Sequence, residues 1–226
     1  MILQAKSCKE GCLTIVQNEI TARKVIANVG PLPDQQMKSL ADALLSGGIS
    51  VMEVSFHQAD PDSFPRTTDN LRLLREDYPS SLIVGAGNVL TVDQLQLAYE
   101  AGAQFAVIPI ADRDLIVRGK DLGLTVIAGG FTATEIHAAY AAGADLAMVF
   151  PVGSLGPNYL RSLQASLSHI PLLVSGGVNE ANADDYRRAG AVAVEVGGKL
   201  TGREWIENGQ WTDIQALAAM YVKAVD

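Results

Sequence analysis

The segments YEAGAQFAVI (residues 99–108) and KDLGLTVIAG (residues 120–129) share one pattern: a helix end, a glycine and a short apolar run. Gly102 and Gly123 fit the C-terminal cap of a helix, where a left-handed residue satisfies the last carbonyl groups. The apolar runs do not alternate with polar residues, which is typical of parallel strands covered on both faces. The same pattern returns at three more glycines, Gly48, Gly143 and Gly190. The sequence therefore predicts a chain built from repeated strand–helix units.

The repeated pattern extends over most of the chain. Strands are predicted at 25–29, 50–56, 82–85, 105–108, 124–127, 145–150, 172–174 and 191–196. Helices are predicted at 35–47, 68–77, 91–101, 111–121, 132–142, 157–168, 179–188 and 212–224, with an extra helix near 8–22. Eight strands that alternate with eight helices favour an α/β fold, the (β/α)8 TIM barrel, and an open doubly wound sheet is the alternative. No linker divides the chain, so we expect one domain over 1–226, with 1–22 as an N-terminal helical extension.

The composition narrows the classes of function. Hydrophobic residues make up 48% of the 226 residues, charged residues 19%, and the formal net charge is −8. There is no basic block and no apolar run near the roughly 20 residues of a membrane helix, so we expect neither nucleic-acid nor membrane binding. The first residues lack the apolar region of a secretory signal, which predicts a cytoplasmic protein. Cys8 and Cys12 are the only cysteines, and we expect reduced thiols there rather than a metal site.

Two pairs of glycines follow the last two predicted strands. They lie in SGGV (175–178) and VGGK (196–199), and the glycines are Gly176, Gly177, Gly197 and Gly198. In such barrels the loops after strands 7 and 8 often bind phosphate, because main-chain N–H groups can approach the anion. A helix start after strand 7 is expected to add positive potential, and Lys199 to add a point charge. The competing interpretation is that the glycines only turn the chain.

One acid interrupts the apolar stretch VMEVSFH (residues 51–57). A desolvated carboxylate has a raised pKa and can hold a proton near neutral pH, so Glu53 is the best candidate for a general acid–base. The alternative is a structural carboxylate that is hydrogen-bonded to a neighbour or to water. Glu53 and His57 could also be taken as metal ligands, but no motif supplies a third ligand, so we expect no metal and no cofactor. The following residues, 58–70, contain two prolines and are predicted to form a loop at the active face.

The order of several motifs resembles one enzyme family over residues 25 to 215. The motifs are VMEVSFH (51–57), IVGAGNVLT (83–91), AGAQFAVIP (101–109), VFP (149–151), SGGVNEAN (175–182) and VGG (196–198). They resemble those of the 2-keto-3-deoxy-6-phosphogluconate / 4-hydroxy-2-oxoglutarate aldolases. The resemblance implies a homotrimeric barrel and a class I aldolase that cleaves a 2-keto-4-hydroxy acid into pyruvate and an aldehyde. The partner implied is therefore a small keto acid or sugar phosphate.

The resemblance also assigns residues. It implies that a strand-6 lysine forms a Schiff base with the keto acid and that the strand-2 glutamate, here Glu53, shuttles protons. The phosphate glycines match the family's pairs after strands 7 and 8. Pro109 and Phe150 match positions that surround the substrate. His57 stands where the family has the arginine for the pyruvate carboxylate, and Asn88 where it has a threonine.

Three departures from the family bear on the mechanism. Met148 stands at the position of the Schiff-base lysine, and a thioether cannot form an imine. Lys199 stands where the family has a strand-8 serine, and it is the only lysine expected at the C-terminal end of a strand. Arg66 precedes a threonine, as the family's arginine does, so an insertion is expected to have displaced it while leaving it able to reach the site.

Three functions therefore remain open on sequence grounds. The first is an aldolase-family lyase with pyruvate-type substrates. The second is another enzyme on the same scaffold, in which Glu53 acts as the base of an isomerase, an epimerase or a metal-assisted lyase on a phosphorylated sugar acid. The third is a non-catalytic descendant that binds a sugar phosphate or keto acid. The fold alone does not select among them.

Overall fold

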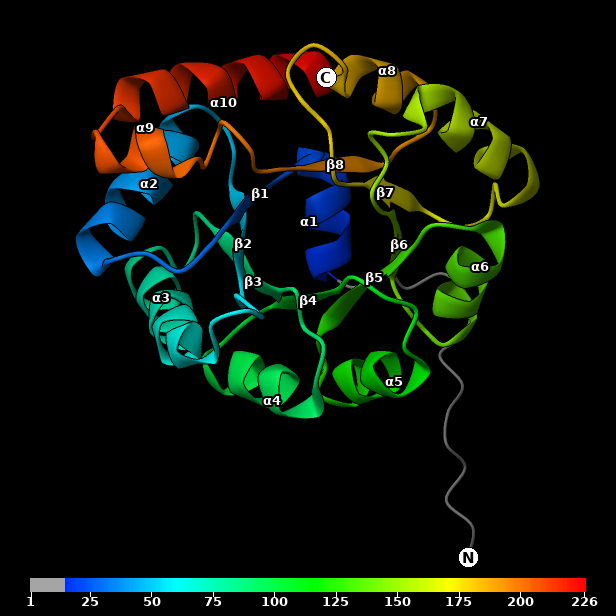
Figure 1. Ribbon diagram of the computed structural model, residues 1–226, viewed down its shortest axis with the longest axis horizontal. Coiled ribbons are helices and arrows are strands. Elements are labelled where there is room, and N and C mark those ends of the chain that lie inside the picture. The colour runs from blue at the N-terminus through cyan, green and yellow to red at the C-terminus, as the bar shows by residue number, and fades with distance from the viewer. Residues whose placement is uncertain (1–14) are drawn as a thin grey trace, which may run out of the picture.

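The structure, a computed structural model, describes residues 15–226. Eight parallel strands close into a barrel in chain order, and the last strand pairs with the first (Figure 1). The helices form a ring outside the strands. The predicted (β/α)8 barrel is confirmed, while Cys8 and Cys12 lie outside the described residues.

The strands agree with the apolar runs of the sequence. They are β1 Val25–Val29, β2 Val51–Ser55, β3 Ile83–Gly87, β4 Phe105–Ile108, β5 Thr125–Gly130, β6 Leu146–Val149, β7 Leu172–Val174 and β8 Ala193–Val196. Nearly all of their residues are buried, because the helices cover one side and the barrel interior the other. This explains why the runs carry little alternation of polar and apolar residues.

The helices follow the strands as predicted, and the structure adds the short helix α9 and the 3-10 turn η1. The helices are α1 Ile15–Arg23, α2 Asp34–Ser46, α3 Phe64–Asp77, α4 Val92–Glu100, α5 Arg113–Asp121, α6 Ala133–Ala141, α7 Gly156–Ser166, α8 Ala183–Arg188, α9 Arg203–Glu207 and α10 Trp211–Val225, with a 3-10 turn η1 Pro61–Ser63. The sequence did not predict α9, which is too short to show a periodic pattern. No helix within residues 15–226 is long and apolar enough to cross a membrane.

The segment 58–70 corrects a prediction. Its second half is not a loop but the first turns of α3, which begin at Phe64 and Pro65. A proline is compatible with the first turn of a helix, because the N–H group that it lacks has no partner there. The Phe64 ring packs edge to face on Phe56, with 5.2 Å between the ring centres. This contact fixes α3 against the end of β2. Pro61 begins the 3-10 turn η1 and Pro65 lies in the first turn of α3, so neither proline prevents a helix.

The N-terminal helix α1 closes one end of the barrel. Ile20 on α1 is fully buried and belongs to the same apolar cluster as Ile26, Phe105 and Leu146 at the start of three strands. Gln17 donates a hydrogen bond of 2.8 Å to the carbonyl oxygen just before β6. In Figure 1, α1 lies within the outline of the ring of strands. The described part of the interior is therefore covered at its N-terminal end, and the site faces the other end.

Candidate active site

Glu53 lies in the middle of β2 and is fully buried. Its Oε1 atom accepts hydrogen bonds of 2.8 Å from Asn28 Nδ2 on β1 and from Ser55 Oγ. Asn28 stands opposite Glu53 in the β1–β2 register, which explains why their side chains meet. Gly87 on β3 leaves the space that the carboxyl group fills, because a Cβ there would lie 1.4 Å from Oε1. The second glycine of the motif GAG (residues 85–87) thus makes room for the Glu53 carboxyl group.

A second acid, Glu195, lies beside Glu53. Glu195 lies on β8, which pairs with β1, and only 7% of the surface of this residue is exposed to solvent. Its Oε1 atom accepts hydrogen bonds from Ser175 Oγ at 2.9 Å and from Asn28 Nδ2 at 3.4 Å. The side chains of Glu53 and Glu195 are also within hydrogen-bonding reach of each other. Asn28 therefore bridges two buried carboxyl groups.

The environment of this pair keeps protons on it. Burial raises the pKa of Glu53 well above its ordinary value, and the negative charge of Glu195 raises that pKa further. Burial also raises the pKa of Glu195, although hydrogen bonds with Glu53, Ser175 and Asn28 oppose the shift. Neither acid takes part in an ion pair of the described chain. Two neighbouring buried carboxyl groups do not both ionise easily, so this environment favours one proton shared by the pair.

A cavity of about 350 Å³ adjoins the pair at the C-terminal end of the barrel. Its walls come from the ends of β1, β3, β4, β6, β7 and β8 and from the residues that follow them: Asn28, Asn88, Val107, Pro109, Met148, Phe150, Ser175, Gly176, Gly177, Val178, Glu195, Gly197 and Gly198. Glu195 reaches this wall, whereas Glu53 does not. The predicted residues Asn88, Pro109 and Phe150 are brought together here.

The predicted glycines form another part of the same wall. Gly176, Gly177 and Gly198 have φ angles of 77°, 104° and 52°, which glycine adopts most readily. A Cβ at Gly176 would lie 2.9 Å from the rings of Phe150 and Pro151, so no side chain fits there. The helix predicted after β7 is present, but it begins at residue 183 rather than 179, because the chain turns over 175–182 first.

The wall of β6 carries no amine. Met148 is 2% exposed and packs among the apolar residues of the barrel interior. No lysine of residues 15–226 lines the cavity. The Lys199 ammonium lies 4.6 Å from the centre of the Trp205 ring and does not reach the cavity wall. The position at which the family resemblance implies a Schiff-base lysine therefore carries a thioether.

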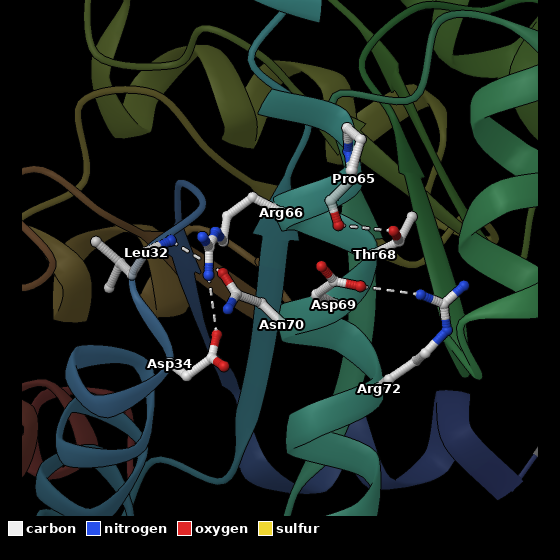
Figure 2. A network of polar contacts seen from close by, with 8 residues as sticks. All are labelled: Leu32, Asp34, Pro65, Arg66, Thr68, Asp69, Asn70 and Arg72. Carbon is white, nitrogen blue, oxygen red and sulfur yellow. Dashed lines mark hydrogen bonds and ion pairs between the residues drawn. The ribbon is translucent and has the colours of Figure 1, made fainter. Parts of the chain in front are cut away.

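His57 and Arg66 lie elsewhere. Both line a separate cavity of about 720 Å³ between the ends of β1 and β2 and the helices α3 and α9. Arg66 pairs with Asp34, with 3.1 Å between Nη1 and Oδ1, and both side chains are exposed (Figure 2). The structure therefore does not bring His57 or Arg66 to the carboxyl pair. Among the described residues, no group of three or more His, Cys, Asp or Glu side chains is arranged to hold a metal ion.

Sequence reasoning left Glu195 without a role. It stands in the run AVEV (193–196), where an acid interrupts an apolar strand just as Glu53 does in VMEVS. The same signal therefore could have found it. Asn28 and Ser175 also lie at strand ends, but an amide or a hydroxyl at such a position is too common to indicate a site by itself.

Comparison with known proteins gives a consistent result. A family model described as KDPG and KHG aldolase matches residues 16–217. The 2-dehydro-3-deoxy-6-phosphogalactonate aldolase of Escherichia coli is 30% identical over 172 residues, which cover 76% of this chain and 80% of that protein. The KHG/KDPG aldolase of Escherichia coli is 29% identical over 211 residues, which cover 90% of this chain and 96% of that protein.

Solved structures show the same relationship. A native KDPGal structure superposes with a TM-score of 0.78 at 27% identity and covers 88% of this chain and 93% of its own. A KDPG aldolase from Legionella pneumophila, with pyruvate captured as a covalent carbinolamine, superposes with a TM-score of 0.82 at 26% identity, covering 91% and 97%. The closed barrel, the site at its C-terminal end and these similarities lead to one conclusion: the chain belongs to the KDPG and KHG aldolase family, whose members are lyases.

Proposed function

We propose that the chain is a carbon–carbon lyase that acts on a phosphorylated 2-keto sugar acid without a lysine Schiff base. The observation that carries the proposal is the pair of buried acids beside a cavity that no lysine of residues 15–226 lines. The names of the relatives support the substrate class, since they refer to 2-dehydro-3-deoxy-6-phosphogalactonate and 2-dehydro-3-deoxy-phosphogluconate. The glycine-lined wall of the same cavity is the proposed position of the phosphate group.

The cleavage needs a base and a place for negative charge. A carboxylate oxygen takes the proton of the substrate 4-hydroxyl group, and the electron pair of that O–H bond forms the carbonyl of the aldehyde. The C3–C4 bond breaks, and its electron pair forms the C2=C3 bond of the pyruvate enolate while the charge moves to the C2 oxygen. The carboxyl then returns the proton to C3, which gives pyruvate. The atoms and charge balance with no added co-reactant.

Polar groups of the cavity are suited to stabilise the enolate. In the related enzymes an iminium accepts the electrons, but Met148 cannot supply one. The Asn88 side chain lines the cavity and is available as a hydrogen-bond donor. Glu195, which lines the cavity, is a second donor once it has taken the hydroxyl proton, because a neutral carboxyl group can stabilise an enolate oxygen. These donors are weaker than an iminium, so we expect a slow enzyme.

Proton NMR in deuterium oxide tests the proposal. The purified chain is incubated with 2-keto-3-deoxy-6-phosphogluconate, its galactonate epimer and 4-hydroxy-2-oxoglutarate, and in a separate sample with pyruvate alone. We expect release of pyruvate from a phosphorylated substrate and exchange of the methyl protons of pyruvate for deuterium. The absence of both from every sample would reject the proposal. Proton exchange at the substrate without cleavage would instead indicate an isomerase or epimerase.

Borohydride trapping tests the lysine-independent part. Incubation with pyruvate and borohydride, followed by mass spectrometry of the intact chain, is expected to show no added mass. An adduct mapped to Lys199 would revive the Schiff-base mechanism. The homotrimer and the cytoplasmic location that the sequence predicts stay predictions, for which light scattering and cell fractionation are the measurements.

A further inference from the structure

We propose that Glu195, and not Glu53, is the carboxyl group that exchanges a proton with the substrate, and that Glu53 is the positioning residue that shares a proton with it. The proposal rests on the proposed function for its chemistry but on the geometry of the site for the assignment of roles. It concerns a residue of β8 that the sequence analysis left without a function.

Access to the cavity separates the two acids. Glu195 forms part of the cavity wall and is 7% exposed, whereas Glu53 is fully buried and absent from the wall. A substrate that occupies the cavity would therefore touch Glu195 before it could reach Glu53. Asn28, which bonds both carboxyl groups, also lines the cavity. Direct proton transfer is thus open to Glu195, whereas Glu53 reaches the substrate only through another group or a bridging water.

The hydrogen bonds leave one oxygen of each acid without a donor. Both Oε1 atoms are held by donors: Asn28 and Ser55 for Glu53, and Ser175 and Asn28 for Glu195. Both Oε2 atoms are buried, and no other donor of the described residues reaches them. A buried oxygen without a donor is costly, so a proton between the two carboxyl groups satisfies both at once.

The shared proton gives Glu53 a function behind the cavity wall. When Glu195 takes the hydroxyl proton of the substrate, it becomes neutral, and the remaining proton of the pair lies on Glu53. The pair then holds two protons and no charge, and Glu195 delivers one of them to C3. Of the groups that face Glu195, Glu53 from β2, Asn28 from β1 and Ser175 from β7, only Glu53 titrates.

Infrared spectroscopy tests the shared proton without any substrate. The wild-type chain is expected to show the carbonyl stretch of a protonated carboxylic acid at neutral pH. The variants Glu53→Gln and Glu195→Gln are each expected to change that band, because each breaks the pair. The exposed Glu76 of α3 gives a matched control, and Glu76→Gln should leave the band unchanged. A band that neither active-site variant alters would overturn the proposal.

Kinetics separate the two roles. We expect Glu195→Gln to lower the rate of methyl-proton exchange in pyruvate by about 10³-fold with little change in KM. Glu53→Gln is expected to lower kcat by only about tenfold and to change the pH profile, because Glu195 then titrates alone. If Glu53→Gln loses more activity than Glu195→Gln, the roles are reversed and the proposal is wrong.

Further measurements keep the result decisive. If Glu195→Gln does not fold, Ser175→Ala removes a hydrogen bond to Glu195 without changing either acid, and should alter both the infrared band and the pH profile. Inactivity of the wild-type chain with an intact shared-proton band rejects the proposed function but not the shared proton. Elemental analysis that finds a stoichiometric divalent cation, lost in Glu195→Gln, would show that a metal ion and not a proton joins the acids, and would overturn the proposal.

Discussion

The two sides of the barrel interior differ in chemistry at the level of the cavity. The strands β7, β8, β1 and β2 carry the polar side, with Glu53 and Glu195 joined through Asn28. The strands β4 and β6 carry an apolar side, with Val107 and Met148 in the cavity wall. Among the described residues, no lysine lines the apolar side of the cavity. This difference favours proton transfer from the polar side over covalent catalysis from the apolar side.

Placing an amine on the apolar side is the strongest way to break the comparison. Met148→Lys puts a lysine beside the cavity at the position where the family resemblance implies the Schiff-base lysine. We expect borohydride to trap pyruvate on it, with an adduct visible by mass spectrometry where the wild type shows none. Burial of the amine should lower its pKa and cost about 1–3 kcal/mol of unfolding free energy.

The matched control for that variant is Met148→Leu. It preserves the volume and apolar character, so it should cost less than about 1.5 kcal/mol and give no adduct. A lysine variant that folds but traps no pyruvate would show that the cavity does not place a keto acid next to β6.

Filling the space under Glu53 tests the polar side. Gly87→Ala puts a Cβ where Glu53 Oε1 now lies, so the carboxyl must leave Asn28 and Ser55. We expect a loss of about 1–3 kcal/mol in the free energy of unfolding, measured by urea denaturation, and a changed infrared band. Gly30→Ala is the control, since a Cβ there meets no atom within 4 Å. If the two variants lose the same free energy of unfolding, the Glu53 carboxyl group does not depend on the space at Gly87.

The pH dependence of stability sharpens the comparison further. A folded-state pKa of Glu53 above its unfolded value means that the folded chain holds more protons, so stability falls as pH rises above about 4.5. Glu53→Gln removes the ionisable group, and we expect a flatter stability curve and a gain relative to wild type at high pH. Thermal denaturation from pH 4 upward measures the difference. If the wild-type stability instead rises over this pH range while that of the variant stays flat, folding lowers the pKa of Glu53, and the prediction is wrong.

The smallest expected effect concerns the donor on β7. Ser175→Ala removes the hydrogen bond to Glu195 Oε1, which should cost about 1 kcal/mol. The pKa of Glu195 should also rise, because that hydrogen bond lowers it in the wild type. Carbon NMR of labelled glutamate follows this titration. An unchanged titration of Glu195 would show that Ser175 does not stabilise its charge.

The sequence predicted the barrel well because its signals are local. Apolar runs and capping glycines mark the strands and helix ends, and all eight strands were found. The helical residues 64–67 were missed because the two prolines of 58–70 favour a loop, although the first turn of a helix accepts Pro65. The sequence also found Glu53. It could not show that Glu195 lies beside it, because that contact depends on closure of β8 onto β1. The positions of His57 and Arg66 likewise depend on how α3 packs, which local patterns do not specify.

The helix α1 gives the site a kinetic property. It covers the N-terminal end of the interior through Ile20 and the hydrogen bond from Gln17, so the described barrel opens to the carboxyl pair at one end. In the proposed reaction, the substrate and both products pass this opening. We therefore expect the aldehyde half at the glycine-lined wall and the pyruvate half beside Glu195 to leave in sequence rather than independently. An ordered release of this kind makes each product an inhibitor whose pattern reveals which half departs last.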